Sequence, residues 1–94
     1  SLVKEALKRI VDIQMSRVAK RLAERGITLQ LTEQAKSYLA DVGWNPVYGA
    51  RPLKRAIEKH LLNPLASELL QGRFMEGATI IADADVDGIQ FRQG

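Results

Sequence analysis

Hydrophobic residues near the start of the chain recur at steps of three and four, which is the spacing of one face of an α-helix. This stripe consists of Val3, Leu7, Ile10, Val11, Met15, Val18 and Leu22. Gly26 follows the stripe, and helices commonly end at a glycine. The pattern therefore predicts a helix from Leu2 to about Arg25. Residues 27–31 then alternate apolar and polar, which predicts a half-buried strand.

A second helix is predicted to follow this strand. Thr32 fits the capping position, and Glu33 places negative charge in the first turn, where the helix dipole favours it. The helix is expected to end at Gly43 and to bury Ala35, Tyr38, Leu39 and Val42. A turn-rich segment, residues 44–50, comes next.

The next helical pattern starts at Pro52, because proline suits the first position of a helix. Its apolar line is Leu53, Ile57 and Leu61. Pro64 removes a backbone donor and clashes with the preceding turn, so the helix is expected to break or kink there. The pattern then continues to Gly72 through Leu65, Leu69 and Leu70.

Two strands are predicted at the end of the chain, at residues 78–84 and 89–92, joined as a hairpin through residues 85–88. The fold class is therefore α+β, with about four helices, the last kinked or broken at Pro64, packed on a small three-stranded sheet. The chain has 94 residues, of which 46% are hydrophobic and 27% charged, and this predicts one globular domain over residues 1–94.

Composition excludes several classes of protein. Without cysteine the chain forms no disulfide, no thiolate nucleophile and no Cys-based zinc site. No apolar stretch approaches the 18 or so residues that a membrane span needs, so no membrane partner is expected. Lys4 and Glu5 interrupt any secretory leader. Ser1 in place of Met suggests a piece excised from a longer protein, of cytosolic type.

Charge is spread unevenly over the sequence. The net charge is +3, but up to Gly26 seven Lys/Arg stand against three Asp/Glu, which gives +4. A basic first helix suits contact with nucleic acid or with an acidic protein surface. A solvated helix face explains the same pattern, and base rates favour it.

Motif searches leave no catalytic set. No glycine is followed by lysine, so the Walker pattern is missing, and no Gly-x-Gly-x-x-Gly is present. Asp83, Asp85, Asp87 and Gly88 match the opening of an EF-hand loop, but its twelfth position is Gly94 instead of Glu. An acidic hairpin turn explains these residues better. The single histidine, His60, has no second ligand or carboxylate beside it, so no metal site is predicted.

The segment from Gly49 to Arg55 is the most informative stretch. Arg51 stands at a helix entry, directly after a glycine and a small residue, with Lys54 and Arg55 close behind it. A guanidinium there suits phosphate as a fork-shaped donor, and an ordinary surface cluster is the alternative. Trp44 and Tyr48 flank Pro46, where aromatic packing that fixes the turn is favoured over ligand stacking.

Residues 43–57 also resemble a known family. The run Gly-Trp-Asn-Pro-Val-Tyr-Gly-Ala-Arg-Pro-Leu that starts at Gly43 is similar to the C-terminal small domain of the second AAA+ module in Clp-type ATPases, most closely the disaggregase branch. Residues 10–14, 21–26, 31–35 and 63–66 support the likeness, which covers nearly the whole chain. Trp44 and Asn45 stand where the family more often has Tyr and Asp.

The resemblance implies a nucleotide-sensing role without catalysis by this chain alone. Arg51 would be the sensor-two arginine, reaching the terminal phosphates of ATP. Ala50 and Ile13 would lie near the base or sugar. ATP or ADP with Mg²⁺ would be held mainly by a preceding AAA+ large domain, so the parent would be an ATPase.

The resemblance further implies a set of partners. These are the preceding large domain, neighbouring subunits of a homohexamer, unfolded or aggregated protein substrates and the DnaK chaperone system. The protein would be a stress-response chaperone of the bacterial cytoplasm or an organelle matrix, with no nucleic acid among its ligands. The competing reading is a small basic nucleic-acid-binding module that uses the first helix and the Arg51/Lys54/Arg55 cluster.

Overall fold

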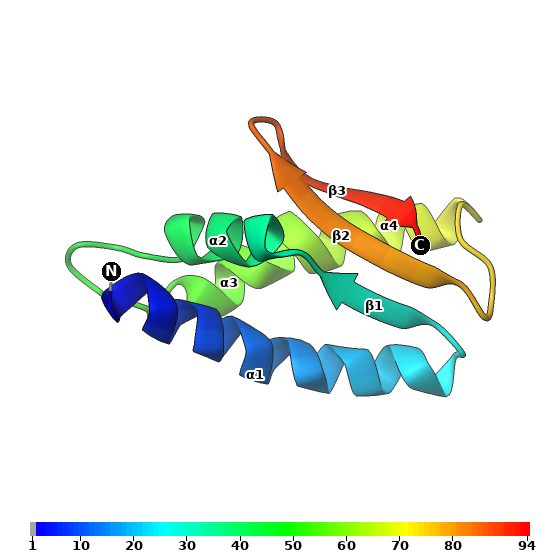
Figure 1. Ribbon diagram of the computed structural model, residues 1–94, viewed down its shortest axis with the longest axis horizontal. Helices are drawn as coiled ribbons and strands as arrows, with labels where there is room; N and C mark the ends of the chain where they lie inside the picture. Colours follow the sequence, from blue (N-terminus) through cyan, green and yellow to red (C-terminus); the bar gives the residue numbers. More distant parts are fainter. Residues whose placement is uncertain (1) are drawn as a thin grey trace.

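The computed structural model describes residues 2–94 and begins with a long helix, α1 (Leu2–Glu24) (Figure 1). Buried side chains of α1 lie four residues apart at Leu7, Val11 and Met15, as the predicted stripe requires. After α1, Gly26 adopts a φ of +75°, which lets the Ile27 amide donate back to the Leu22 carbonyl at 2.9 Å. The chain therefore reverses sharply into the first strand.

The sheet is mixed. Its strands β1 (Thr28–Leu31), β2 (Thr79–Asp85) and β3 (Gly88–Gln93) are ordered β1-β2-β3. β1 runs parallel to β2, with Thr28 opposite Thr79, and β2 runs antiparallel to β3, with Asp85 opposite Gly88. The predicted three strands and the hairpin are thus confirmed, and the central strand β2 contributes the buried Ile80 to the core.

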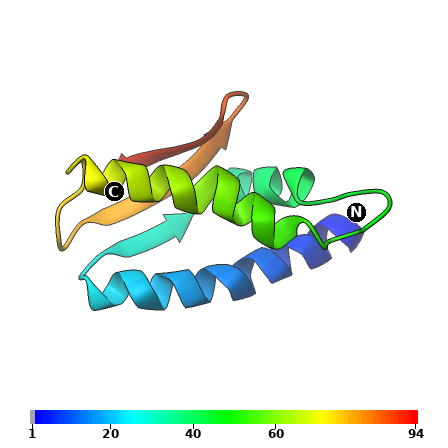
Figure 2. The same cartoon turned by 180° about the vertical axis from the view of Figure 1, so that it is seen from behind.

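Helices cover one face of this sheet. A long helix from Leu53 to Leu70 lies behind the sheet in Figure 1 and in front of it in Figure 2. It shares one hydrophobic core with α1, α2 (Glu33–Val42) and the sheet. The largest fully buried side chains of that core are Val11, Leu39, Leu53, Leu61 and Ile80. The two-layer α+β architecture agrees with the predicted fold class.

The prediction of about four helices is wrong, because the described residues form three. α3 (Leu53–Ile57), the π-helical turn η1 (Glu58–Leu62) and α4 (Asn63–Leu70) run on as one helix (Figure 2). Of the kink or break predicted at Pro64, the break does not occur, and a π turn precedes the proline. In the π turn the Asn63 amide donates to the Glu58 carbonyl, five residues back. This wider turn directly precedes Pro64, where the backbone donor is missing and a regular α-helix would clash with the proline ring.

The buried face of α2 also differs from the prediction. Ala35 and Leu39 are buried as expected and Tyr38 is partly buried, but Val42 is exposed and Ala40 is buried in its place. Gly43 ends α2 and also makes room for α3. A Cβ at Gly43 would collide with the Leu53 side chain and lie 2.9 Å from the Leu39 carbonyl oxygen. The end of α2 therefore packs directly against the start of α3.

Thr32 joins α2 to the sheet. Its hydroxyl oxygen accepts a hydrogen bond from the Ala35 amide at 3.1 Å, as the predicted cap does, and its hydroxyl donates to Asp83 Oδ1 at 2.7 Å. Arg92 on β3 donates to Asp83 Oδ2 at 3.0 Å. The Thr32 hydroxyl, the Ala84 amide and Arg92 together lower the pKa of Asp83 to about 2. Through these hydrogen bonds Asp83 on β2 links the start of α2 to β3.

We expect Leu61→Ala to cost about 2–5 kcal/mol of unfolding free energy, because the fully buried side chain would leave a cavity in the core. Chemical denaturation measures this as a lower midpoint. Leu70→Ala is the control, since Leu70 is 89% exposed and the same truncation should leave the midpoint unchanged. Ile57→Val, a milder change at a buried site, should cost about 0.5–1.5 kcal/mol if Leu61→Ala fails to fold. Equal midpoints for Leu61→Ala and Leu70→Ala would contradict the described core.

Asp83 should make the stability of the chain sensitive to acid. Because its pKa is lower in the folded chain than the ordinary value of 3.8, the stabilisation is present above pH 3.8 and is lost as the pH falls towards 2. Between pH 4 and pH 2 the Thr32→Val variant should lose less stability than the unchanged chain. The Thr32→Ser variant should lose as much stability as the unchanged chain. Thermal unfolding across that pH range is the measurement, and indistinguishable profiles for the two variants would rule out the hydroxyl as the main cause.

Candidate functional site

Arg51 lies on the surface at the point where the loop after α2 enters α3. Its exposed guanidinium is 5.9 Å from the centre of the Tyr48 ring. Together with Pro52 and Arg55, these two residues line an open groove of about 350 Å³. Among the residues that the structure describes, no carboxylate pairs with Arg51. The side chain is thus a free donor for an anion.

A single side chain holds the backbone of this loop. Asn45 Oδ1 accepts hydrogen bonds from the amides of Val47 at 2.7 Å and Tyr48 at 3.0 Å. The backbones of Asn45 and Gly49 also pair in both directions, at 2.9 and 2.7 Å. Gly49 has a φ of +65°, a conformation that costs glycine little. Asparagine closing a turn on amides two and three residues ahead is a common turn chemistry, so Asn45 fixes the path of the loop.

Aromatic packing, which the sequence predicts for this turn, acts beside these hydrogen bonds. The Trp44 ring lies against Gly49, because a Cβ built at Gly49 would be 3.7 Å from it, whereas Tyr48 is 60% exposed. Sequence reasoning overlooked Asn45 as a structural residue and Tyr48 as a neighbour of Arg51. An asparagine followed by Pro46 and Gly49 was the signal that could have identified the turn.

Ala50 and Ile13, the other predicted nucleotide contacts, occupy different surroundings. Ala50 is partly buried against the core, and its carbonyl accepts the first amide of α3, from Leu53, at 3.0 Å. Ile13 is 58% exposed on α1. The residues that line the Arg51 groove come from the loop and the start of α3, and Ile13 is not one of them. Ala50 does not line this groove either: it only precedes Arg51 in the chain, and Ile13 lies on a separate helix.

The basic cluster predicted around Arg51 divides between two surfaces. Arg55 shares the groove of Arg51, whereas Lys54 faces a smaller groove of about 160 Å³ between α1 and the long helix. Arg17 and Arg21 of α1 line that second groove, opposite Glu58. The positive charge of the first helix and that of the Arg51 loop are therefore parts of different surfaces.

His60 has a packing role in the structure. It is partly buried on η1, its Nδ1 lies 3.5 Å from the Tyr38 hydroxyl oxygen, and the two rings meet edge to face with centroids 5.6 Å apart. Gly88 of the hairpin lies against the same Tyr38 hydroxyl, because a Cβ built there would be 3.3 Å from it. His60 therefore sits at the edge of the core, where α2, η1 and β3 meet.

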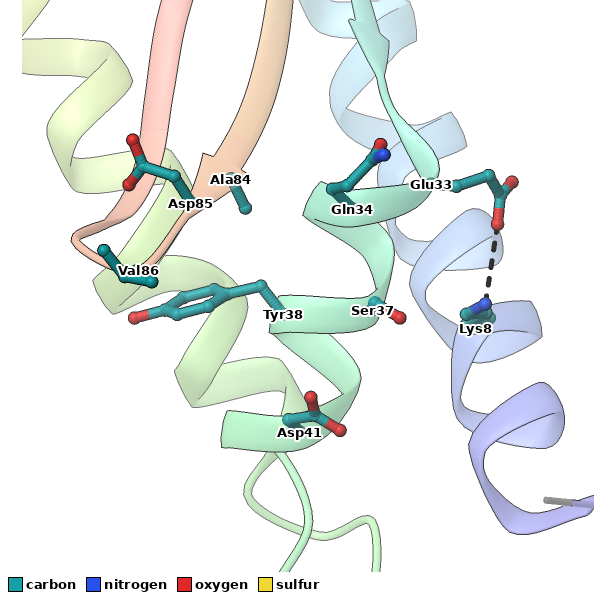
Figure 3. Close-up of a pocket in the computed structure, with 9 residues that line it drawn as sticks. All are labelled: Lys8, Glu33, Gln34, Ser37, Tyr38, Asp41, Ala84, Asp85 and Val86. Carbon is teal, nitrogen blue, oxygen red and sulfur yellow. Dashed lines mark ion pairs between the residues drawn. The ribbon is translucent and has the colours of Figure 1, made fainter.

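Another groove, of about 560 Å³, lies between α2 and the β2–β3 turn (Figure 3). Figure 3 shows Tyr38 reaching under Val86, with Lys8 paired to Glu33 at 3.5 Å at the other end. Nearby, Asp12 accepts a hydrogen bond from Lys36 and with Glu33 raises the pKa of that lysine. The groove itself is lined by one cation, Lys8, and by three carboxylates, Glu33, Asp41 and Asp85, so it offers less to an anionic ligand than the Arg51 groove does.

Neither a metal cluster nor a membrane-spanning helix is present among residues 2–94. Within this range no three His, Cys, Asp or Glu residues gather closely enough to hold a metal ion. In the same residues, no helix combines the length and apolar character needed to cross a membrane. Asp83, the first residue of the EF-hand-like pattern, uses both carboxylate oxygens within the protein.

Comparison with known proteins gives a consistent result. A family model described as the C-terminal, D2-small domain of ClpB protein matches residues 2–82. The chaperone protein ClpB 1 of Thermosynechococcus vestitus is 53% identical over 87 residues, which cover 93% of this chain and 10% of that protein. The chaperone protein ClpB of Gloeobacter violaceus is 50% identical over 93 residues, which cover 99% of this chain and 11% of that protein. The chain thus spans about a tenth of the length of the curated relatives it matches.

The hydrogen bonds that Asn45 accepts lead to a prediction about the stability of the loop. Asn45→Ala should cost about 1 kcal/mol of unfolding free energy, because two backbone amides lose their acceptor. Asn45→Asp should keep most of the stability, since a carboxylate oxygen accepts the same hydrogen bonds. Chemical denaturation followed by the fluorescence of Trp44, the one tryptophan in the sequence, reports on this segment. Equal stability of the Asn45→Ala variant and the unchanged chain would contradict this role.

Proposed function

The chain belongs to the family of C-terminal D2-small domains of ClpB proteins, and from this premise we propose that it is the nucleotide-sensing and oligomerisation lid of an ATP-dependent protein disaggregase. The preceding AAA+ large domain of the parent would bind ATP or ADP with Mg²⁺ and carry out hydrolysis. In this arrangement residues 1–94 form one domain that contributes a sensor and a surface but no catalytic group.

The observation that carries the proposal is the free guanidinium of Arg51. It is exposed, lies in an open groove and has no carboxylate partner among the described residues. A planar guanidinium donates two parallel hydrogen bonds to phosphate oxygens, which gives both affinity and orientation. We assign Arg51 the role of sensor-two arginine towards the terminal phosphates of ATP.

The position of Arg51 suits the coupling of nucleotide state to movement of the domain. The loop that carries it leads into the long helix, whose residues Leu53, Ile57 and Leu61 are anchored in the core. Loss of the γ-phosphate removes oxygens that Arg51 would bind, so the balance between two orientations of the domain shifts. A rigid connection between the arginine and the core would pass that shift to the whole domain.

The remaining nucleotide contacts are proposed on the same basis. Ala50 adjoins Arg51 and presents a small residue, which allows a base or sugar to approach closely. Ile13, an apolar side chain 58% exposed on α1, is suited to cover a base once the large domain is in place. The Walker motif and the Mg²⁺ ligands are assigned to that large domain.

The proposed partners follow from the family. They are neighbouring subunits of a homohexamer, unfolded or aggregated protein substrates, and the DnaK chaperone system, in the cytoplasm of a bacterium or the matrix of an organelle. A groove of about 310 Å³, in which the apolar Val3, Leu7, Ala40 and Trp44 lie beside the ion pair of Lys4 and Asp41, gives the domain a surface suited to packing against another domain. The relatives are chaperones, which favours this assignment over a nucleic-acid-binding module.

The test is steady-state ATP turnover of the full-length protein with Arg51→Ala. Turnover should fall at least about tenfold while sedimentation still shows the assembled oligomer, because a charge-assisted contact to the transferred phosphate is lost. Lys54→Ala is the matched control, since Lys54 is a cation of the same helix that faces the other groove. The melting temperature of the 94-residue chain should be unchanged by Arg51→Ala. Normal turnover in the Arg51→Ala protein would remove the sensor assignment.

A further inference from the structure

The face of the Tyr48 ring lies beside Arg51, and the proposed function gives this ring no role. The guanidinium carbon is 5.9 Å from the ring centre, within the range at which an aromatic face attracts a cation. The Arg51 amide also donates to the Tyr48 carbonyl at 3.3 Å. Tyr48 is 60% exposed, so its ring contributes little to the core.

The place of the ring is set by the loop backbone. Asn45 accepts a hydrogen bond from the Tyr48 amide itself, at 3.0 Å, and the paired backbones of Asn45 and Gly49 close the turn on either side. Tyr48 is therefore held at its backbone while its ring remains at the surface. An aromatic side chain has two rotatable bonds and presents a rigid face, so it limits where a neighbouring arginine can lie.

An arginine that senses phosphate binds better when a neighbouring ring restricts the positions of its side chain. A free arginine side chain samples many rotamers, and ordering it on binding lowers the affinity for its ligand. An arginine already resting on a ring loses less freedom when it binds, and its planar fork stays turned towards the groove.

We propose that Tyr48, held by Asn45, is a positioning residue that orients the Arg51 guanidinium for nucleotide phosphate. The inference rests on the proposed function and adds to it the residue that prepares the sensor. Because the attraction comes from the ring face, phenylalanine should replace tyrosine at this position and an aliphatic residue should not.

The first measurement uses the 94-residue chain alone. Nuclear magnetic resonance of the Arg51 side chain should show protons shifted upfield by the Tyr48 ring. Tyr48→Leu should abolish this shift, Tyr48→Phe should retain it, and Val47→Ala is the matched control at a neighbouring residue that is 80% exposed. An unchanged Arg51 signal in Tyr48→Leu would overturn the inference.

The second measurement is ATP turnover of the full-length protein carrying the same variants. Tyr48→Leu should raise KM for ATP about two- to fivefold, the ratio that an exposed contact of this kind supplies, and Tyr48→Phe should not. Loss of folded protein would instead lower the apparent kcat without raising KM. An unchanged KM in Tyr48→Leu, or an equal rise in Tyr48→Phe, would overturn the inference.

Arg51→Ala in the same assay separates the two proposals. A severe loss with Arg51→Ala and none with Tyr48→Leu would reject only the role of Tyr48. Normal turnover with Arg51→Ala would reject the sensor itself, and the role of Tyr48 with it.

Discussion

Burial of one face of the helix from Leu53 to Leu70 is the interaction on which the rest of the structure depends. Leu53, Ile57 and Leu61 are buried in one core with side chains of α1, α2 and the sheet, and burial of apolar side chains is the main source of stability in a domain of this size. The same helix lies on the crossover between the parallel strands β1 and β2, so its docking is what lets these distant segments pair. The loop that contains Arg51 leads into the first turn of this helix.

The domain combines a backbone that is tightly held with one exposed charged group that is left free. Carboxylates neutralise the cations around α2, where Lys36 pairs with Asp12 at 3.0 Å, and Arg92 pairs with Asp83. At Arg51 no such partner is described, although Asn45 fixes the loop beneath it. Such an arrangement costs little stability and keeps a donor ready for an anion, which agrees with the role proposed for this family member.

Much of the fold could be predicted because its signals are local. The apolar stripe of α1, the cap at Thr32 and the hairpin after Asp85 each depend on residues that are close in sequence. The predictions failed where long-range packing decided the outcome. Pro64 would break an isolated helix, but the buried side chains before and after it hold the chain helical, and a π turn accommodates the ring.

The sequence by itself determined the order of elements, the family and the arginine at the helix entry, because these follow from spacing and residue type. Only the tertiary structure decided which surface each cation faces: Arg55 joins Arg51, and Lys54 turns to α1. It also decided that Gly43 must be small and that Tyr48 lies beside Arg51. The physical reason is that such contacts depend on the angle at which α2, α3 and α1 pack, and packing angles are set by the whole core.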